Sequence, residues 1–380
     1  MVWAAAACVN GFATLQHKVS TNTMKIIPIS SLTKFAKKNL QGKICFSPYV
    51  VIEVGVDGEV GLCDCKAWLP SSVGNLFEQT LPEILSNNLS QAIRQSIADG
   101  SYEYCNESRC GVINDGQLVD SAGLDNPVLL NLINDSSQWI MPREIWIAGD
   151  RTCNLSCPSC RTKVIKNSPK DTKKLEELGL ILKNNLFAQP SDEKITLNIS
   201  TTGEVFASPM LMAFLNDIDV VDFPNISLHV QTNGLMAEKN WHRLGALQDR
   251  VKKITVTVDA ATADTYEKLR RGGRWSDLQQ ALTWIANKKT ENNMEINLRM
   301  VLQRDNYCEI TPFYSMCKSA GADLVEYTRI LNWNTFANQE FKAVDVFELG
   351  HPEYQKAWQQ LDQVADFPDV FLHGGLVKSV

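Results

Sequence analysis

The segment Cys153-Asn-Leu-Ser-Cys157-Pro-Ser-Cys160 places three thiols within eight residues, at CX3CX2C spacing. The preceding residues, 144–148, are apolar and β-prone, and they lead into the polar residues 149–152. This pattern predicts a strand followed by a loop, with all three cysteines on the loop. A closed structural zinc site takes four protein ligands. Three thiols therefore indicate a centre with one open coordination position.

A four-iron, four-sulfur cluster held by three thiolates has one iron free to bind a small molecule. The CX3CX2C loop after a first strand resembles the signature of the radical S-adenosylmethionine (radical SAM) enzymes. This resemblance implies that Cys153, Cys157 and Cys160 bind a catalytic [4Fe-4S] cluster whose free iron chelates SAM. One electron from the cluster would then split SAM into methionine and a 5′-deoxyadenosyl radical, which takes a hydrogen atom from the substrate. Taken alone, the three thiols are also compatible with a zinc knuckle or a chance cluster.

The composition indicates a globular, cytoplasmic protein. With 380 residues, 44% of them hydrophobic, the chain can form one large core with a smaller domain, or two mid-sized domains. The net charge is −6 without a long basic run, so we expect no nucleic-acid or anionic-membrane partner. No apolar run approaches the roughly 20 residues that span a bilayer. Without a clear secretion signal, the clustered cysteines are interpreted as metal ligands in a reducing compartment.

Five segments are predicted along the chain. Met24 starts a more ordinary N-terminal sequence, so the residues before it are interpreted as an extension that is disordered or not native. Asn, Asp, Gly and Ser are frequent between 111 and 140, which indicates turns and a linker. The predicted segments are the extension (1–23), an auxiliary cluster domain (24–112), a linker (113–140), the radical SAM core (141–332) and a C-terminal helical segment (333–380).

A hairpin is predicted early in the auxiliary domain. The β-prone runs 50–56 and 59–62 flank Asp57-Gly58, a dipeptide that favours a tight turn. Cys45 precedes the first run and Cys63 ends the second, so the hairpin should fold the two thiols toward each other. A helix is expected to follow, ending near residue 97.

Two more thiols, Cys105 and Cys110, lie close together in the next polar loop. With the hairpin thiols they make four, enough for structural zinc or a second iron–sulfur cluster. The pattern Cys45-X12-Gly58-X4-Cys63 resembles the SPASM/twitch domain of certain radical SAM enzymes. The resemblance implies an auxiliary [4Fe-4S] cluster with Cys45, Cys63, Cys105 and Cys110 as ligands.

The auxiliary domain departs from that family in two ways. It precedes the core, whereas in most relatives it follows, and it has too few cysteines for two auxiliary clusters. The shorter, single-cluster twitch form therefore fits better. Cys65 is an alternative ligand in place of Cys105 or Cys110, and a zinc ribbon is the alternative for the whole site.

From residue 141 onward, apolar strands and helices alternate, which predicts a parallel α/β sheet. Six such repeats are too few for a closed eight-stranded barrel, and the resemblance implies the partial (β/α)6 TIM-like barrel of radical SAM enzymes. In α/β folds ligands bind at the carboxyl ends of the strands. The expected strands lie near 144–148, 194–199, 226–231, 253–258, 295–301 and 322–327.

Two motifs follow the second and third of these strands. Gly203-Glu204 resembles part of the family's Gly-Gly-Glu-Pro motif, which implies hydrogen bonds to the SAM amino group. Thr202 and Val205 depart from that motif. Thr232-Asn233-Gly resembles the strand end near the SAM adenosine, although Asn-Gly also favours simple turns. A turn glycine beside a solvated acid is the alternative for the first motif.

The fourth strand and the run 266–273 resemble the Ser-Ile-Asp-Gly…Tyr…Arg-Gly-Gly pattern of SPASM-type proteins. Thr257 and Asp259 should point into the barrel from alternate positions, to contact SAM or to order the site. Arg299 on an inward face would need a charge partner, for which we consider the SAM carboxylate, or else it is a surface arginine. No role is assigned to Cys308, Cys317, His351 or His373.

Together these patterns predict a radical SAM oxidoreductase or maturase. The auxiliary cluster would accept or relay an electron, and a reductant such as flavodoxin or ferredoxin would supply the first one. The substrate is expected to be a small molecule, a sugar or a peptide. The first two are favoured because no peptide-binding leader module is recognisable. The alternatives are a non-catalytic iron–sulfur electron carrier or sensor on the same fold, and a zinc-stabilised binding module.

Overall fold

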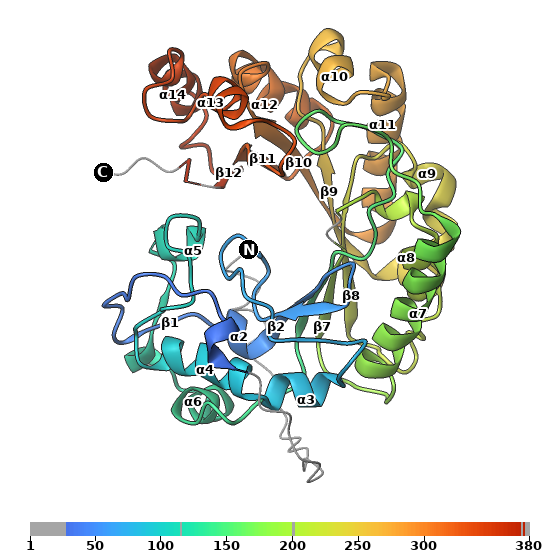
Figure 1. Cartoon of the computed structure of the whole chain (residues 1–380). Coiled ribbons are helices and arrows are strands. Elements are labelled where there is room, and N and C mark those ends of the chain that lie inside the picture. Colours follow the sequence, from blue (N-terminus) through green and yellow to red (C-terminus); the bar gives the residue numbers. More distant parts are fainter. Residues whose placement is uncertain (1–27, 115, 200–201, 374, 377–380) are drawn as a thin grey trace. The chain divides into compact units, whose positions relative to one another are not determined.

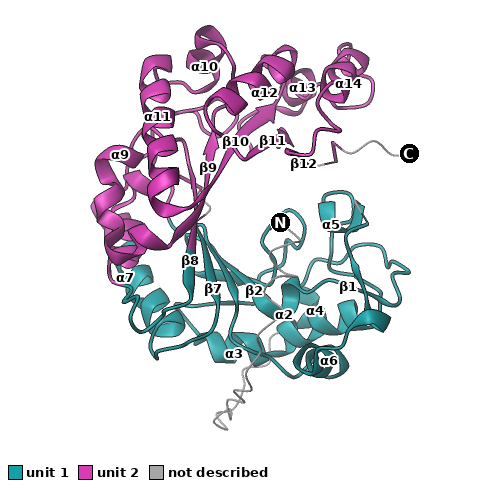
Figure 2. Ribbon diagram, turned by 180° about the vertical axis from the view of Figure 1, so that it is seen from behind, with its two compact units in different colours: residues 1–149, 173–198, 218–227 teal, residues 150–172, 199–217, 228–380 magenta. Residues whose placement is uncertain are grey.

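The computed structural model describes residues 28–114, 116–199, 202–373 and 375–376 (Figure 1). The predicted extension 1–23 and the proposed start at Met24 lie outside these residues. The chain forms two compact units (Figure 2). Unit 1 comprises 1–149, 173–198 and 218–227, and unit 2 comprises 150–172, 199–217 and 228–380.

Unit 1 is built on a mixed sheet. The strands β2 (Val51–Val54) and β3 (Glu59–Gly61) form the predicted antiparallel hairpin, and β4 (Gly74–Asn75) pairs with β3. On its other edge β2 runs parallel to β6 (Glu144–Ile147), and β7 (Ile195–Ile199) follows. A separate pair joins β1 (Lys43–Ile44) to β5 (Val119–Asp120).

The hairpin turn needs its glycine. Gly58 has φ +79°, a conformation that residues with a Cβ rarely adopt. A Cβ at this position would also lie 2.6 Å from the Phe77 ring. The turn predicted from Asp57-Gly58 is thus confirmed, and the positive φ of Gly58 explains why a glycine is needed there.

The helices of unit 1 differ from the prediction. A short helix α2 (Ser47–Val50) separates Cys45 from β2. The long helix expected to end near residue 97 is two helices, α3 (Leu81–Ser86) and α4 (Asn88–Ala98). Asn87 causes the break, because its backbone is extended and its side-chain oxygen accepts hydrogen bonds from the N–H groups of Leu89 and Ser90.

The segment predicted as a linker contains folded structure. It begins within α5 (Gly111–Asn114) and includes the 3-10 turn η2 (Ser121–Gly123) and helix α6 (Pro127–Asn134). Leu129 and Leu132 of α6 are buried in one hydrophobic cluster with Trp146 of β6. Asn126 caps the helix and Pro127 starts it. The Asn-Pro pair that indicated a turn therefore marks a helix N-terminus.

Unit 2 contains a parallel sheet whose strands follow chain order: β8 (Ile226–Thr232), β9 (Val251–Thr257), β10 (Glu295–Leu302), β11 (Leu324–Arg329) and β12 (Val370–His373). With β6 and β7 of unit 1, this confirms the six predicted core strands and the α/β fold class. The last strand, β12, was not predicted, because the C-terminal segment was interpreted as helical.

Helices connect these strands. Helix α7 (Pro169–Leu186) lies mostly in unit 1. The helices of unit 2 are η3 (Val205–Ala207), α8 (Pro209–Asn216), α9 (Ala237–Asn240), η4 (Trp241–Arg250), α10 (Ala263–Leu269), α11 (Trp275–Asn292), η5 (Tyr307–Glu309), α12 (Ile310–Ser319), α13 (Asn338–Val344) and α14 (Tyr354–Asp362).

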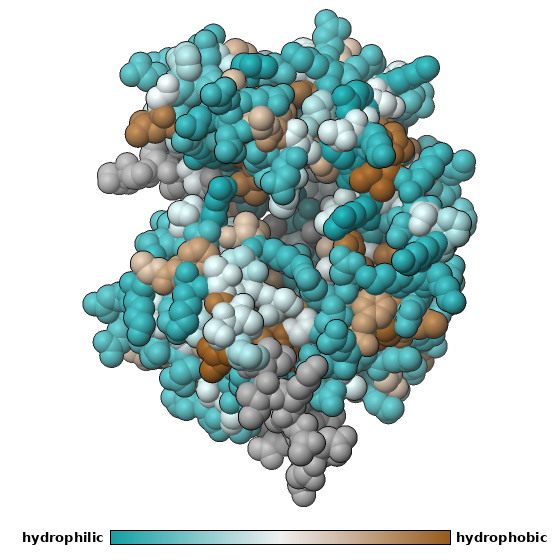
Figure 3. Space-filling model, viewed as in Figure 1, coloured by the Kyte–Doolittle hydropathy of each residue, from teal (hydrophilic) through white to brown (hydrophobic). Residues whose placement is uncertain are grey.

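The surface is mainly polar. On the face drawn in Figure 3, hydrophobic side chains form separate small patches among hydrophilic ones. Among the described residues, no helix has both the length and the apolar character needed to cross a membrane.

Candidate functional site

The three cysteines lie on one loop of unit 2, as predicted. Cys153 and Cys157 are buried beside Leu155, whereas Cys160 is exposed. The N–H of Cys160 donates to the carbonyl of Cys157 at 2.9 Å, so the last two thiols lie on one turn. The loop therefore presents one sulfur to solvent and keeps two within the protein.

Each sulfur lies close to an N–H group. Two of these groups belong to guanidinium ions, which are charge-assisted hydrogen-bond donors. Three deprotonated cysteines are what a [4Fe-4S] cluster with one open iron requires, so these residues fit that group. The contacts are Leu155 N to Cys153 Sγ at 3.4 Å, Asn233 Nδ2 to Cys153 Sγ at 4.0 Å, Arg270 Nη1 to Cys157 Sγ at 3.5 Å, and Arg161 Nη2 to Cys160 Sγ at 3.3 Å.

Burial alone would keep one of these thiols protonated. It raises the pKa of Cys153, while the Leu155 N–H and the Arg161 guanidinium act in the opposite direction. A coordinated metal keeps a thiol deprotonated. Across the part of the chain that the structure describes, no three His, Cys, Asp or Glu side chains converge closely enough for a single metal ion.

Asp150 organises the entry to the cysteine loop. Its carboxylate is 1% exposed and accepts hydrogen bonds from the backbone and the hydroxyl of Thr152 at 2.8 and 2.9 Å. It also accepts from Asn167 Nδ2 and from Ser208 Oγ. One buried carboxylate thus joins both ends of the loop to the start of α8.

Gly203 approaches the same loop closely. A Cβ at this position would lie 2.3 Å from the carbonyl oxygen of Thr152 and 2.6 Å from that of Asp150. The next residue, Glu204, donates its N–H to the Thr152 oxygen at 2.8 Å. The predicted Gly-Glu motif therefore packs, backbone against backbone, on the segment that leads into the cysteines.

The Glu204 carboxylate joins this motif to the end of β8. Its oxygens accept from Thr232 Oγ1 at 2.6 Å, from Asn233 N at 2.7 Å and from Phe206 N at 3.2 Å. Burial raises the pKa of Glu204, and these hydrogen bonds oppose the rise. The predicted residues Glu204, Thr232 and Asn233 are thus brought together. The amide of Asn233 then reaches Asn154 Oδ1 in the cysteine loop at 2.8 Å.

Asp259 and Thr257 converge on one arginine rather than on open space. Arg270 donates to the carbonyl of Thr257 and lies 3.3 Å from Asp259 Oδ2. The same arginine contacts the sulfur of Cys157. Arg270 therefore links Asp259 to the cysteine loop, because it contacts both Asp259 and Cys157.

Arg299 has a charge partner within the protein. Its guanidinium donates to Glu326 Oε2 from Nε at 2.7 Å and from Nη2 at 2.5 Å, and it contacts Gln231 Oε1 at 3.1 Å. The buried charge that the sequence indicated is thus compensated by Glu326, and the SAM carboxylate is not needed for that purpose. Burial raises the pKa of Glu326, but Arg299 and His373 outweigh it, so this pKa lies well below its ordinary value.

Glu326→Gln is expected to destabilise the protein by about 3 kcal/mol at pH 7, because the Arg299 charge loses its buried counter-ion. Urea unfolding measures this loss. The lowered pKa of Glu326 means that the ion pair contributes fully above the ordinary pKa of about 4.3 and is lost on acidification. The difference between variant and parent should therefore shrink toward pH 3. The control is Glu295→Gln, which removes an exposed partner of Lys253 and should cost under about 1 kcal/mol. Equal losses in the two variants would contradict the prediction.

In unit 1, the four predicted auxiliary thiols influence one another. Burial raises the pKa of Cys63, and the neighbouring Cys45 and Cys110 raise it further. Burial and the same two cysteines also raise the pKa of Cys105. Burial raises the pKa of Cys65 to about 11, but the side-chain charges that act on it are those of Asp64 and Glu53. Cys45 and Cys110 thus raise the pKa of both Cys63 and Cys105, and the assignment of these four cysteines as cluster ligands stays a prediction.

Tyr102 connects two parts of this cysteine set. Its side chain is fully buried and its hydroxyl donates to the carbonyl of Lys43 at 2.8 Å, two residues before Cys45. Its backbone has φ +47°, which is unusual for a residue with a Cβ, and its carbonyl accepts from the N–H of Cys105. The tyrosine therefore holds the Cys105 loop against the strand that leads to Cys45.

Sequence reasoning missed several polar side chains of the site in unit 2. Asp150 and Arg161 flank the cysteine loop, and Arg270 lies within the quoted run 266–273, where it had no assigned role. Arg161 directly follows the third cysteine, and it also donates to the carbonyls of Arg151 and Thr202. Adjacency to a ligand was the signal that could have found it. Nothing in the local sequence indicated the contact of Arg270 with Cys157, which is 113 residues away.

Comparison with known proteins gives matches to both parts of the chain. Residues 45–111 match the SPASM family, described as an iron–sulfur cluster-binding domain. A curated relative, GTP 3′,8-cyclase of Alkaliphilus metalliredigens (strain QYMF), is 29% identical over 137 residues, which is 35% of this chain and 39% of that protein. This chain thus spans well under half of that relative.

Similar solved structures include Streptococcus suis SuiB bound to S-adenosylmethionine, with a TM-score of 0.40 and 15% identity over 61% of this chain and 51% of SuiB. Native anSMEcpe with bound AdoMet has a TM-score of 0.39 and 15% identity over 59% of each chain. The SPASM match, residues 45–111, lies within the auxiliary domain predicted at 24–112. The CX3CX2C loop resembles the signature of radical SAM enzymes, and the SPASM match places an iron–sulfur cluster-binding domain before it in the chain.

Proposed function

We propose that this protein is a radical SAM enzyme that oxidises a polar substrate, with an auxiliary cluster that accepts or relays an electron. The observation that carries the proposal is the single loop with three cysteines, each facing an N–H donor. Cys153, Cys157 and Cys160 would hold the first [4Fe-4S] cluster. When bound, this cluster and SAM supply the 5′-deoxyadenosyl radical that abstracts hydrogen.

The chain's own residues supply position and shielding. Gly203 lets the Gly-Glu segment lie against the entry to the cysteine loop, and Glu204 fixes Thr232 and Asn233 at the end of β8. These groups are the candidates to contact SAM, because Glu204 N donates to Thr152 O before the cysteine loop and Asn233 Nδ2 donates to Asn154 Oδ1 within it. Arg299, held by Glu326, is a candidate contact to the substrate rather than to SAM.

A polar substrate is favoured by side chains of the unit 2 sheet. Asn297 is fully buried, and its side-chain oxygen accepts no hydrogen bond from the described residues. Its amide nitrogen donates to Glu326, which also lies 3.5 Å from His373 Nε2. Buried polar atoms without a partner are costly, and a ligand with hydroxyl or amino groups would satisfy them. A sugar or another polar small molecule fits this set, and a polar peptide side chain would fit it as well.

The auxiliary cluster is assigned to Cys45, Cys63, Cys105 and Cys110 of unit 1. Four cysteine ligands leave no iron open, so a substrate could bind there only by displacing a ligand. Accepting an electron from the oxidised substrate, or passing one on, is the role that remains. A small acidic or flavin-containing reductant such as flavodoxin or ferredoxin would supply the first electron.

The test is SAM cleavage by the reconstituted protein. After loading with iron and sulfide and reduction with dithionite, the full chain should convert SAM to 5′-deoxyadenosine and methionine, as measured by liquid chromatography. The matched control replaces Cys153, Cys157 and Cys160 with alanine, which should abolish the product and leave about four irons per chain at the auxiliary site. A fully loaded protein without 5′-deoxyadenosine would favour the electron carrier or sensor, and stoichiometric zinc without iron would favour the binding module.

A further inference from the structure

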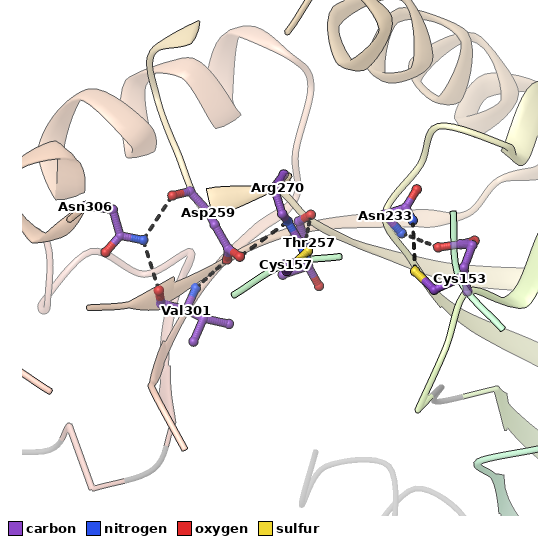
Figure 4. Close-up of polar contacts among 9 residues, drawn as sticks. Cys153, Cys157, Asn233, Thr257, Asp259, Arg270, Val301 and Asn306 are labelled. Atoms are coloured by element: carbon purple, nitrogen blue, oxygen red, sulfur yellow. Dashed lines mark hydrogen bonds and ion pairs between the residues drawn. The ribbon is translucent and has the colours of Figure 1, made fainter. Parts of the chain in front are cut away.

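Arg270 occupies a distinctive place beside the cysteine loop. It follows helix α10, and its side chain is 11% exposed. Figure 4 shows its guanidinium between the carboxylate of Asp259 and the sulfur of Cys157. Nη1 lies 3.5 Å from the Cys157 sulfur, and Nη2 donates to the carbonyl of Thr257. A largely buried positive charge therefore lies beside one of the proposed cluster ligands.

Asp259 is built into the sheet so that it can hold this arginine. Its Oδ1 accepts from the backbone N–H of Val301 at 2.7 Å, which leaves Oδ2 to face Arg270 at 3.3 Å. Its carbonyl accepts from Asn306 Nδ2 at 2.9 Å, and the same amide donates to the carbonyl of Val301. Asp259 has φ +68°, a backbone conformation that costs free energy in a residue with a Cβ. The surrounding bonds maintain this conformation at the point where β9 ends.

The other two sulfurs have different surroundings. Cys160 is exposed, so solvent weakens the effect of the neighbouring Arg161 charge. Cys153 faces a backbone N–H and a neutral amide. Cys157 differs from both: it is buried, and it contacts a guanidinium that a carboxylate holds in place.

We propose that Arg270, fixed by Asp259, is a positioning residue that raises the reduction potential of the cluster ligated by Cys157. The proposal rests on the proposed function, because it takes Cys157 as a cluster ligand. Reduction adds negative charge to the cluster, and a guanidinium near a ligand sulfur stabilises the reduced form. Its hydrogen bond also withdraws electron density from the thiolate. The first electron would therefore enter more easily than it would without this arginine.

The experiment is a potentiometric titration of the reconstituted full chain followed by EPR. The relevant signal is the one that changes when SAM is added, which separates the first cluster from the auxiliary one. In Arg270→Gln, the ratio of reduced to oxidised cluster at a fixed potential should fall about tenfold, equivalent to a midpoint about 59 mV more negative. Arg270→Lys keeps the charge and should shift the midpoint less.

The neighbouring arginine provides the matched control. Arg271 donates to Ser156 Oγ at 3.1 Å and to the carbonyl of Thr162 at 3.1 Å, within the same loop. Arg271→Gln removes an equal charge next in sequence and should leave the midpoint unchanged. Asp259→Asn removes the anchor of Arg270 but also a negative charge that opposes it, so a more negative midpoint in this variant would show that the loss of positioning outweighs the loss of that charge.

The outcomes distinguish this proposal from the proposed function. A parent-like midpoint in Arg270→Gln with full iron content overturns the role of Arg270. If that variant does not take up iron, Arg270→Lys decides, since it keeps the charge but changes the hydrogen-bond geometry: a parent-like midpoint overturns the role, and a negative shift smaller than about 59 mV supports it. If the parent chain shows no SAM-sensitive EPR signal at all, the proposed function fails first.

Discussion

Gly203→Ala is expected to abolish iron binding at the three-cysteine loop and, with it, SAM cleavage. The added Cβ would lie 2.3 Å from the Thr152 carbonyl oxygen and 2.6 Å from the Asp150 oxygen. Both are backbone atoms, so no side-chain rotation relieves the overlap. The segment that leads into Cys153 must shift, and the hydrogen bond from Glu204 N to Thr152 must lengthen or break. Because the ligands must converge to within a fraction of an ångström, we expect the loss of about four irons per chain.

Iron content and the SAM-dependent EPR signal of the variant measure this loss. Gly123→Ala is the matched control, since a Cβ there meets nothing within 4 Å and the residue is exposed in η2. The control should bind iron as the parent does. Iron at the auxiliary site should remain in Gly203→Ala, because its four cysteines lie in unit 1. A Gly203→Ala protein with parent-like iron and SAM cleavage would show that the loop tolerates this shift.

The sequence was sufficient for features that local chemistry determines. Strand–helix alternation predicted β6 to β11, and Asp57-Gly58 predicted the hairpin because the turn needs φ above zero. The spacing of three cysteines predicted their common loop. The family resemblance then predicted which loops accompany it, and the structure brings Glu204, Thr232 and Asn233 together.

The rest depended on contacts between distant residues. Arg299 was predicted to be either a buried charge in need of a partner or a surface arginine, and its partner Glu326 lies 27 residues away on another strand. Arg270 follows the fourth core strand and contacts Cys157, which lies 113 residues earlier in the sequence. The buried leucines of α6 were hidden in a polar stretch, because Asn126 and Pro127 indicate a turn and a helix start equally well. The spacing of residues along the chain cannot distinguish a turn from a helix start, or predict which distant residues meet. These features become visible only in the packed structure.

Cys110→Ala is expected to lower the iron content below about eight per chain by weakening the auxiliary cluster, whereas Cys65→Ala should retain all of the iron. Cys110 is buried, and its charge raises the pKa of both Cys63 and Cys105. Removing it leaves three thiolates for the auxiliary cluster. Cys65 is much closer to Cys63 in the sequence, but the side-chain charges that act on it are those of Asp64 and Glu53. This pair of variants therefore tests the assignment directly, because both lose one half-buried or buried thiol from the same domain.

Iron and sulfide analysis of the reconstituted variants, with Mössbauer spectra to separate cluster types, provides the measurement. Three thiolates can retain a cluster with an exchangeable fourth ligand, so partial loss in Cys110→Ala is informative only beside Cys65→Ala. Greater iron loss in Cys65→Ala than in Cys110→Ala would assign Cys65, and not Cys110, as the cluster ligand. SAM cleavage without substrate should persist in Cys110→Ala, because the three cysteines of unit 2 are intact, while turnover of substrate should fall. SAM cleavage and substrate turnover should respond differently because the auxiliary cluster acts after hydrogen abstraction. A Cys110→Ala protein that turns over substrate like the parent would contradict the electron-accepting role of the auxiliary cluster.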